Sequence, residues 1–206
     1  MDKEKYCFSE NSNLFTRNYQ PKAGDTVMDI GSGVGEEICF FSTAVGESGH
    51  VYAIEADPTL YKRNIDLVST LGLKNVTCIN VAIMDKTCSV KIGRHSDDGI
   101  DSSIYAKNPR DFIIAPARSI DELLDEYGID YLDYVKINIE GAESFAVQGV
   151  KDLSRIKNWC ISTHDFRGMP TKKFVVDFFT SKGVSVDIHE EVEFQPHKGG
   201  YLYITQ

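Results

Sequence analysis

Short apolar runs alternate with longer segments of helical periodicity along most of the chain. Strands are predicted by the apolar runs at residues 26–30, 50–55, 76–83, 134–139 and 159–163. Helices are predicted by the segments at residues 34–45, 57–71, 143–150 and 171–181. This alternation is typical of a parallel sheet covered by helices on both faces. Two final apolar runs, at residues 184–188 and 201–205, predict an antiparallel hairpin.

Local signals place several helix ends. Asp57 followed by Pro58 is a helix N-cap with proline at the first helical position, and Gly72 ends that helix. Ser119, with Glu122 three residues later, predicts a capping box.

The part of the chain between the third and fourth predicted strands is less regular. Residues 85–118 contain β-like pieces at 89–92 and 113–117, separated by a polar, turn-rich stretch. We therefore predict one domain over residues 1–206, with an N-terminal segment at 1–24. We expect residues 85–118 to form an insertion that serves the substrate or closes over it as a lid.

Composition narrows the classes of partner. The formal net charge of −9 argues against a broad electrostatic contact with nucleic acid or an anionic membrane. No apolar run approaches the roughly 20 residues that span a bilayer. The five cysteines are odd in number and scattered, which favours reduced thiols over a disulfide framework. We expect a cytoplasmic protein without a nucleic-acid or membrane partner, and the sequence predicts no oligomeric state.

A glycine-rich turn joins the first predicted strand to the first predicted helix. Gly31 permits a sharp turn, Gly33 lets a ligand approach bare backbone, and Gly35 eases entry into the helix. The N-terminus of that helix offers free N–H groups to an anion such as a carboxylate. The turn therefore indicates a ligand site.

The spacing of these glycines separates two classes of nucleotide site. The dinucleotide fingerprint G-x-G-x-x-G requires a small residue at position 36, which is Glu36. The observed G-x-G-x-G, with Asp29 two residues ahead of it, resembles motif I of S-adenosylmethionine enzymes. Glu55, at the end of the second strand, can accept hydrogen bonds from ribose hydroxyls. An NAD-dependent enzyme and a nucleotide-free α/β domain remain alternatives.

The resemblance to S-adenosylmethionine enzymes extends the set of cofactor-binding residues. In methyltransferases of this layout the end of the third strand flanks the adenine ring, which points to Asn80 and Ala82. Either residue could instead satisfy loop backbone. The predicted cofactor-binding residues are Asp29, Gly31, Ser32, Gly33, Gly35, Glu36, Glu55, Ala56, Asn80, Ala82 and Asn138.

A second set of polar residues lies in the fourth and fifth predicted strands. Lys136, Asn138 and Glu140 alternate with apolar residues, so a two-residue period places them on one face. They indicate either an exposed edge strand or a site at the carboxyl end of a buried strand. His164 ends the fifth strand and should emerge near Glu140 or Glu143, where it is either structural or a general base.

The segment YVKINIEGAE at residues 134–143 is similar to the characteristic V-K-I-D-V-E-G-A-E phrase of the FkbM family of methyltransferases. Residues 19–25 and 119–123 also resemble that family, and the likeness covers roughly residues 19–165. It implies a class I, Rossmann-like fold with a mostly parallel seven-stranded sheet. It also implies methyl transfer from S-adenosylmethionine, often to oxygen. Asn138 departs from the family, which has aspartate there.

These observations predict O-methylation of a small polar molecule or glycan. A hydroxyl acceptor needs a base, for which His164 and Glu140 are the candidates. The predicted catalytic residues are His164, Glu140, Asn138 and Glu143. No metal site is predicted, because the acidic stretch 97–101 lacks the spacing of a calcium loop and is read as a solvated turn. A protein methyltransferase and an inactive S-adenosylmethionine-binding protein, suggested by Asn138, are alternatives.

Overall fold

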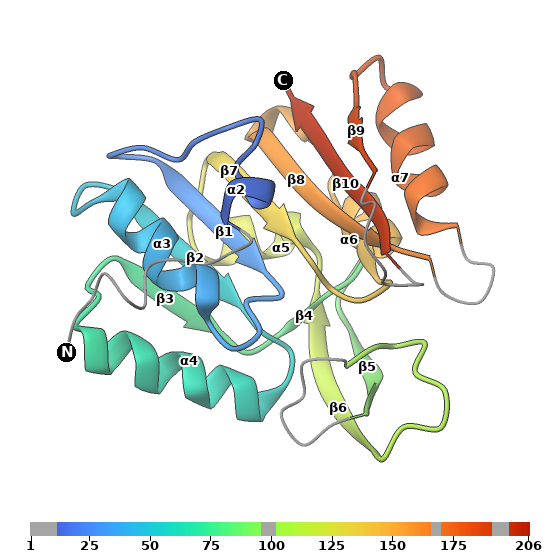
Figure 1. Ribbon diagram of the computed structural model, residues 1–206, viewed down its shortest axis with the longest axis horizontal. Helices are drawn as coiled ribbons and strands as arrows, with labels where there is room; N and C mark the ends of the chain where they lie inside the picture. Colours follow the sequence, from blue (N-terminus) through green and yellow to red (C-terminus); the bar gives the residue numbers. More distant parts are fainter. Residues whose placement is uncertain (1–11, 96–101, 166–169, 191–197) are drawn as a thin grey trace.

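The computed structural model describes residues 12–95, 102–165, 170–190 and 198–206, and in them two β-sheets (Figure 1). The larger sheet has seven strands in the order β3-β2-β1-β7-β8-β10-β9. Its strands are β1 (Thr26–Ile30), β2 (His50–Ile54), β3 (Val76–Ile79), β7 (Leu132–Ile137), β8 (Ile156–His164), β9 (Asp187–His189) and β10 (Lys198–Thr205). Strands β3, β2, β1, β7 and β8 are parallel, and β10 runs antiparallel to both β8 and β9. The predicted seven-stranded, mostly parallel Rossmann-like sheet with its C-terminal hairpin is confirmed.

Helices cover both faces of this sheet, because neighbouring residues of each strand point to opposite sides. Val27 packs in a core with α2 (Ser12–Phe15) and α3 (Glu36–Val45). Met28 packs in a second core on the other face. The helices of that second core are α5 (Ile120–Glu126), α6 (Glu143–Gln148) and α7 (Thr171–Thr180).

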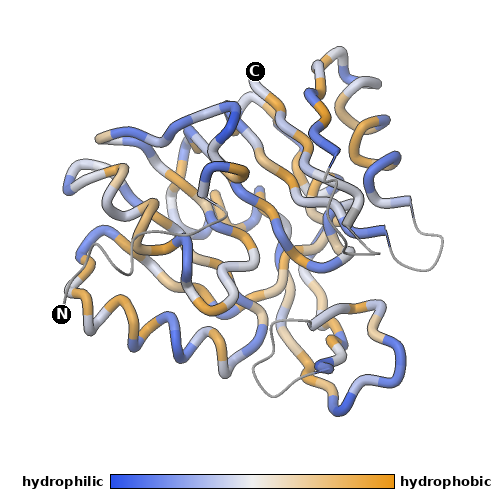
Figure 2. Tube along the Cα trace, in the orientation of Figure 1, coloured by the Kyte–Doolittle hydropathy of each residue, from blue (hydrophilic) through white to orange (hydrophobic). Residues whose placement is uncertain are grey.

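The remaining helices lie at the margins of the sheet. Helix α4 (Pro58–Leu71) packs against the edge strand β3, and orange and blue residues alternate along it in Figure 2, as in an amphipathic helix. A short 3₁₀ helix, η1 (Leu153–Arg155), precedes β8. The predicted ends of α4 are confirmed: the Asp57 side chain accepts from the first turn, and Gly72 has φ +61° at the C-terminus. The Ser119–Glu122 capping box of α5 is also present.

The smaller sheet contains β4 (Ala82–Ile83), β5 (Cys88–Arg94) and β6 (Asp111–Arg118) in the order β4-β6-β5. It projects beside the large sheet in Figure 1. One face is packed: Ile92, Ala115 and Ala117 share a buried cluster with Ala82 and Ala142. Most of the predicted insertion is therefore a folded sheet attached near the end of β7. The polar stretch at 97–101 lies outside the described residues.

The predicted strand at 76–83 is wrong as a single element. The chain divides into β3 of the large sheet and β4 of the small one, with a break at Asn80 and Val81. The Asn80 side chain donates to the carbonyls of Glu55 and Ala56 at 2.8 and 3.2 Å. Its amide thus continues the pairing with the end of β2, while the backbone turns away toward β6.

The predicted strand at 134–139 also ends early. Strand β7 stops at Ile137, and Glu140 and Gly141 have φ values of +51° and +106°. The two-residue period therefore applies to Lys136 alone, and Asn138 and Glu140 lie in the turn that follows the strand. Sequence periodicity missed this turn because apolar and polar residues keep alternating through it.

The cysteines agree with the sequence prediction only in part. Cys78, Cys88 and Cys160 are free thiols. Cys39 is disulfide-bonded, so the prediction that all five cysteines are reduced is wrong for this residue. Among the described residues, no helix is both long enough and apolar enough to cross a membrane.

Candidate active site

A cavity of about 310 Å³ opens at the carboxyl ends of β1, β2 and β7. This is the edge at which open α/β sheets bind ligands. Nine of the residues predicted from the sequence line it: Gly31, Ser32, Gly33, Glu36, Glu55, Ala56, Ala82, Asn138 and Glu140. The wall also includes apolar residues around β4, the charged residues Glu37, Asp57 and Lys136, and three residues that follow β5, Ser102, Ser103 and Ile104.

The glycine turn forms one side of this cavity, and each of its glycines has a different reason to be glycine. Gly31 has φ +78°, and a Cβ there would lie 2.0 Å from the carbonyl oxygen of Asn138. Gly35 has φ +86° and packs on Asn64. Gly33 has φ +54°, but nothing lies within 4 Å of the position of its Cβ. The backbone of Gly33 therefore faces open space that a ligand can fill.

Glu55 holds the glycine turn against the end of β2. Its two carboxylate oxygens accept hydrogen bonds from the N–H groups of Gly33 and Asp57, each at 2.8 Å. Burial raises the pKa of Glu55 to about 7, although both backbone bonds oppose the shift. Each oxygen keeps lone pairs for further donors, so the carboxylate can still accept hydroxyl groups from the cavity.

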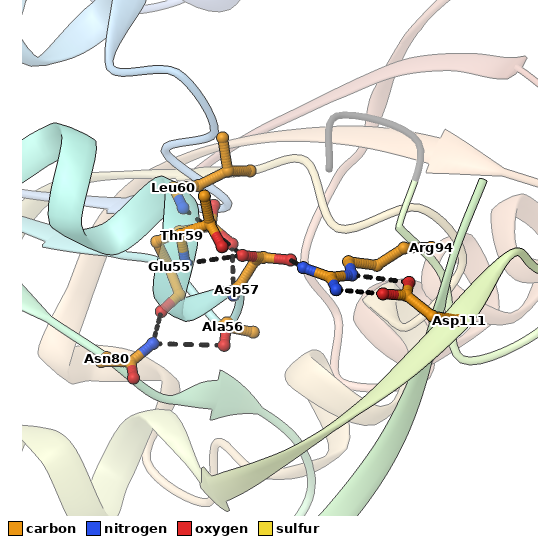
Figure 3. Close-up of polar contacts among 8 residues, drawn as sticks. All are labelled: Glu55, Ala56, Asp57, Thr59, Leu60, Asn80, Arg94 and Asp111. Atoms are coloured by element: carbon orange, nitrogen blue, oxygen red, sulfur yellow. Dashed lines mark hydrogen bonds and ion pairs between the residues drawn. The ribbon is translucent and has the colours of Figure 1, made fainter. Parts of the chain in front are cut away.

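Asp57, which the sequence assigned only to a helix cap, also lines the cavity. One oxygen caps α4 by accepting from Thr59 N at 2.7 Å. The other lies 3.4 Å from the Arg94 guanidinium, which also binds Asp111 (Figure 3). Arg94 lies on β5, so this contact joins the small sheet to Asp57 in the cavity wall.

A buried ion pair supports the glycine turn from below. Asp29 on β1 and Lys136 on β7 are paired in register, and Lys136 Nζ lies 2.8 Å from Asp29 Oδ1. Lys136 Nζ also donates to Gly31 O at 2.8 Å. Burial alone would lower the pKa of Lys136, but the carboxylates of Asp29 and Glu37 outweigh it and raise this pKa. The charged lysine fixes the start of the turn.

Asn138 and Glu140 follow β7 and also line the cavity, with Asn138 beside Gly31. Within the described part of the chain, Asn138 Oδ1 is buried and accepts no hydrogen bond, although its residue lines the cavity. A buried acceptor of this kind is costly unless a donor reaches it. Glu140 also lines the cavity, and its side chain retains 29% of its exposure. Both residues can therefore contact a ligand.

His164 and Glu143 lie behind Glu140 and outside the cavity lining. Glu143 Oε1 accepts from His164 Nδ1 at 2.8 Å, and His164 Nε2 lies 3.3 Å from Glu140 Oε1. Glu143 and His164 are 0% and 1% exposed. The predicted proximity of His164 to both glutamates is present, but Glu140 is the member of the three that faces the cavity.

Five predicted site residues are not in the cavity wall: Asp29, Gly35, Asn80, Glu143 and His164. Asn80 adopts its alternative role, since its amide holds the loop backbone after β2. Sequence reasoning missed Ser103 and the ligand-facing side of Asp57. Asp57 had a usable signal, its position two residues after Glu55, whereas only the fold brings Ser103 to this edge.

A family model for the methyltransferase FkbM domain matches residues 29–195. The chain belongs to the FkbM methyltransferase family. The matched residues include the glycine turn, Glu55, Glu140 and His164. The resemblance read from residues 134–143 is therefore confirmed.

Individual relatives match more narrowly. The protein-L-isoaspartate O-methyltransferase of Thermosipho melanesiensis is 43% identical over 58 residues, which are 28% of this chain and 29% of that protein. The structure of methyltransferase FkbM from Methylobacillus flagellatus has a TM-score of 0.68 at 16% identity, over 98% of this chain and 50% of that one. This chain thus spans about half of that FkbM structure and less than a third of the isoaspartate enzyme.

The fold also occurs in a structure with a bound cofactor. Fibrillarin from Aeropyrum pernix, solved with natively bound S-adenosyl-L-methionine, has a TM-score of 0.58 at 13% identity. The match covers 93% of this chain and 71% of that one. At such identities the likeness shows the fold alone. S-adenosylmethionine, the cofactor predicted for this FkbM chain, is also the ligand in that structure.

Proposed function

We propose that this FkbM-family protein is an S-adenosylmethionine-dependent methyltransferase that methylates a hydroxyl oxygen of a small polar molecule or glycan. One observation carries the proposal: the glycine turn, Glu55 and Glu140 all line a single cavity. The acidic chain favours neither nucleic acid nor an anionic membrane as partner.

The residues present fit the cofactor. Glu55 would accept the ribose hydroxyls, and the bare backbone at Gly33 leaves room for the amino-acid part. Asn138 Oδ1, buried without a hydrogen bond among the described residues, would accept from a donor of the bound molecule. S-adenosylmethionine supplies, when bound, an electrophilic methyl group on a sulfonium.

In this proposal Glu140 would receive the acceptor's proton. It lines the cavity, and His164 behind it lies 3.3 Å from its carboxylate. The acceptor oxygen would bond to the methyl carbon as the bond from that carbon to the sulfonium sulfur breaks, which leaves S-adenosylhomocysteine, and the hydroxyl proton would pass to Glu140. Glu143, which binds His164 Nδ1 at 2.8 Å, would fix the orientation of the imidazole.

A protein carboxylate is the second candidate acceptor, because the isoaspartate O-methyltransferases match part of this chain. The charge of the cavity favours the hydroxyl acceptor. Glu36 and Glu140 line the cavity, and their negative charges would repel an anionic acceptor. Lys136 does not offset this, because it is already paired with Asp29 at 2.8 Å.

The test is transfer of label from methyl-labelled S-adenosylmethionine to a panel of sugars, polyols, phenols and isoaspartyl peptides. Label is expected in an alkali-stable ether from a hydroxyl compound, with at least a hundredfold loss in Glu140→Gln. Label in alkali-labile esters of the peptides would establish the carboxylate acceptor instead. Tight cofactor binding without transfer to any compound would favour the inactive binding protein.

A further inference from the structure

Glu140 occupies a backbone conformation that glutamate rarely adopts, and several side chains hold it there. Its φ of +51° lies in the left-handed region, and Gly141 follows with φ +106°. Glu143 Oε1 accepts from the N–H groups on either side, Ile139 N at 3.3 Å and Gly141 N at 3.2 Å. Such a conformation persists only where its surroundings fix it.

The carbonyl of Glu140 is held from a different part of the chain. Ser103 Oγ donates to Glu140 O at 2.6 Å and accepts from Tyr105 N at 3.1 Å. Ser103 is 4% exposed and itself lines the cavity. Ser103 holds the carbonyl of Glu140 and Glu143 holds the N–H of Gly141, so the peptide group that follows the Glu140 Cα is held at both its oxygen and its nitrogen.

Ser103 is in turn fixed to the small sheet. Its N–H and C=O each pair with the backbone of Gly93 on β5, both at 3.0 Å. Gly93 leaves room for residues that follow Ser103, since a Cβ there would lie 2.6 Å from Ala106 Cβ and 2.8 Å from Pro109 Cβ. The path from β5 to the Glu140 carbonyl therefore consists of short, buried contacts.

We propose that Ser103 is a positioning residue, which holds the strained Glu140 backbone so that its carboxylate faces the cavity. The proposal rests on the proposed function, in which Glu140 accepts the proton. Ser103 follows β5 in the chain, so the small sheet would contribute to the reaction through the hydrogen bond from Ser103 to the Glu140 carbonyl.

The test compares Ser103→Ala, which removes the hydroxyl, with Ser103→Thr, which keeps one. Ser89→Ala, an exposed change on β5, the strand with which Ser103 pairs, is the matched control. Crystal structures of each variant report the φ of residue 140 and the His164–Glu140 contact. Calorimetry with S-adenosylhomocysteine reports the cofactor site, and label transfer to the best acceptor of the panel reports kcat.

In Ser103→Ala, Glu140 is expected to leave the left-handed region and kcat to fall at least tenfold. Affinity for S-adenosylhomocysteine should stay within twofold, and Ser103→Thr should recover most of kcat. An unchanged Glu140 conformation with an unchanged kcat in Ser103→Ala would overturn the proposal. The crystal structures decide the positioning role even if no acceptor is labelled, whereas undiminished transfer by Glu140→Gln would refute only the role of Glu140 as base.

Discussion

At the scale of single residues, the site depends on two carboxylates held in unusual states. Glu55 is buried and carries a raised pKa, because its desolvation outweighs two backbone hydrogen bonds. Glu140 is partly exposed but has a left-handed backbone. The burial of Glu55 and the left-handed backbone of Glu140 both cost stability. Both carboxylates line the cavity, and costs of this kind are typical of functional sites.

Glu55 should make stability depend on pH. Its pKa rises from 4.5 to about 7 on folding, so the stability contributed by the neutral form is present below pH 4.5 and lost as pH rises through 7. Glu55→Gln abolishes this loss. The free energy of unfolding of the variant, minus that of the wild type, should therefore increase by roughly 3 kcal/mol between pH 4 and pH 8.

Urea unfolding at several pH values measures this difference, with the exposed Glu47→Gln as control. A constant difference between Glu55→Gln and wild type across the range would show that the carboxylate is not perturbed by folding.

Glu140 should show a trade-off between stability and activity. Glycine adopts φ +51° without strain, so Glu140→Gly is expected to raise the free energy of unfolding by about 1 kcal/mol while methyl transfer is lost. Glu140→Gln should lose transfer without the gain in stability. Urea unfolding and label transfer check the two effects separately. Lower stability in Glu140→Gly would mean that the conformation is not strained.

At the scale of elements, much of the site could be predicted from the sequence. The glycine turn, the carboxylate that ends β2 and the cap of α4 have local signals, and all three are present. The ends of β3 and β7 could not be predicted, because Asn80 and Glu140 leave the strands through tertiary contacts that apolar alternation does not encode.

Two glycines test whether the turn between β1 and α3 binds a ligand. Gly33 and Gly72 have φ +54° and +61°, with nothing within 4 Å of either Cβ position. Alanine at either should cost about 1 kcal/mol of stability. Only Gly33→Ala should lower the affinity for S-adenosylhomocysteine, by at least tenfold in calorimetry. Equal affinities in the two variants would make the turn purely structural.

The pair that joins β1 to β7 should be critical for folding. Lys136→Met leaves Asp29 buried without its partner, which typically costs 3–5 kcal/mol. The double variant Asp29→Leu and Lys136→Met should recover much of this loss. Chemical unfolding of the three proteins gives the coupling energy between the two side chains. A single variant as stable as wild type would show that the ion pair contributes little.

At the scale of the whole molecule, the order of elements predicted the class of fold, and family membership agrees with it. The alternation of strands and helices leaves few topologies for a parallel sheet. The role of the small sheet could not be predicted, because Arg94 contacts Asp57 and Ser103 contacts Glu140 only once β5 and β6 are folded. Glu55 and Glu140 could be predicted from the sequence, whereas the contacts that hold them come from the fold.

We infer that the cavity binds S-adenosylmethionine through Glu55. Calorimetric titration of the wild type with S-adenosylmethionine, S-adenosylhomocysteine and NAD measures this binding, with Glu55→Ala titrated in parallel. We predict micromolar binding of the two sulfur compounds, loss of both in Glu55→Ala, and no binding of NAD. Binding of NAD alone, or of none of the three, would contradict the account.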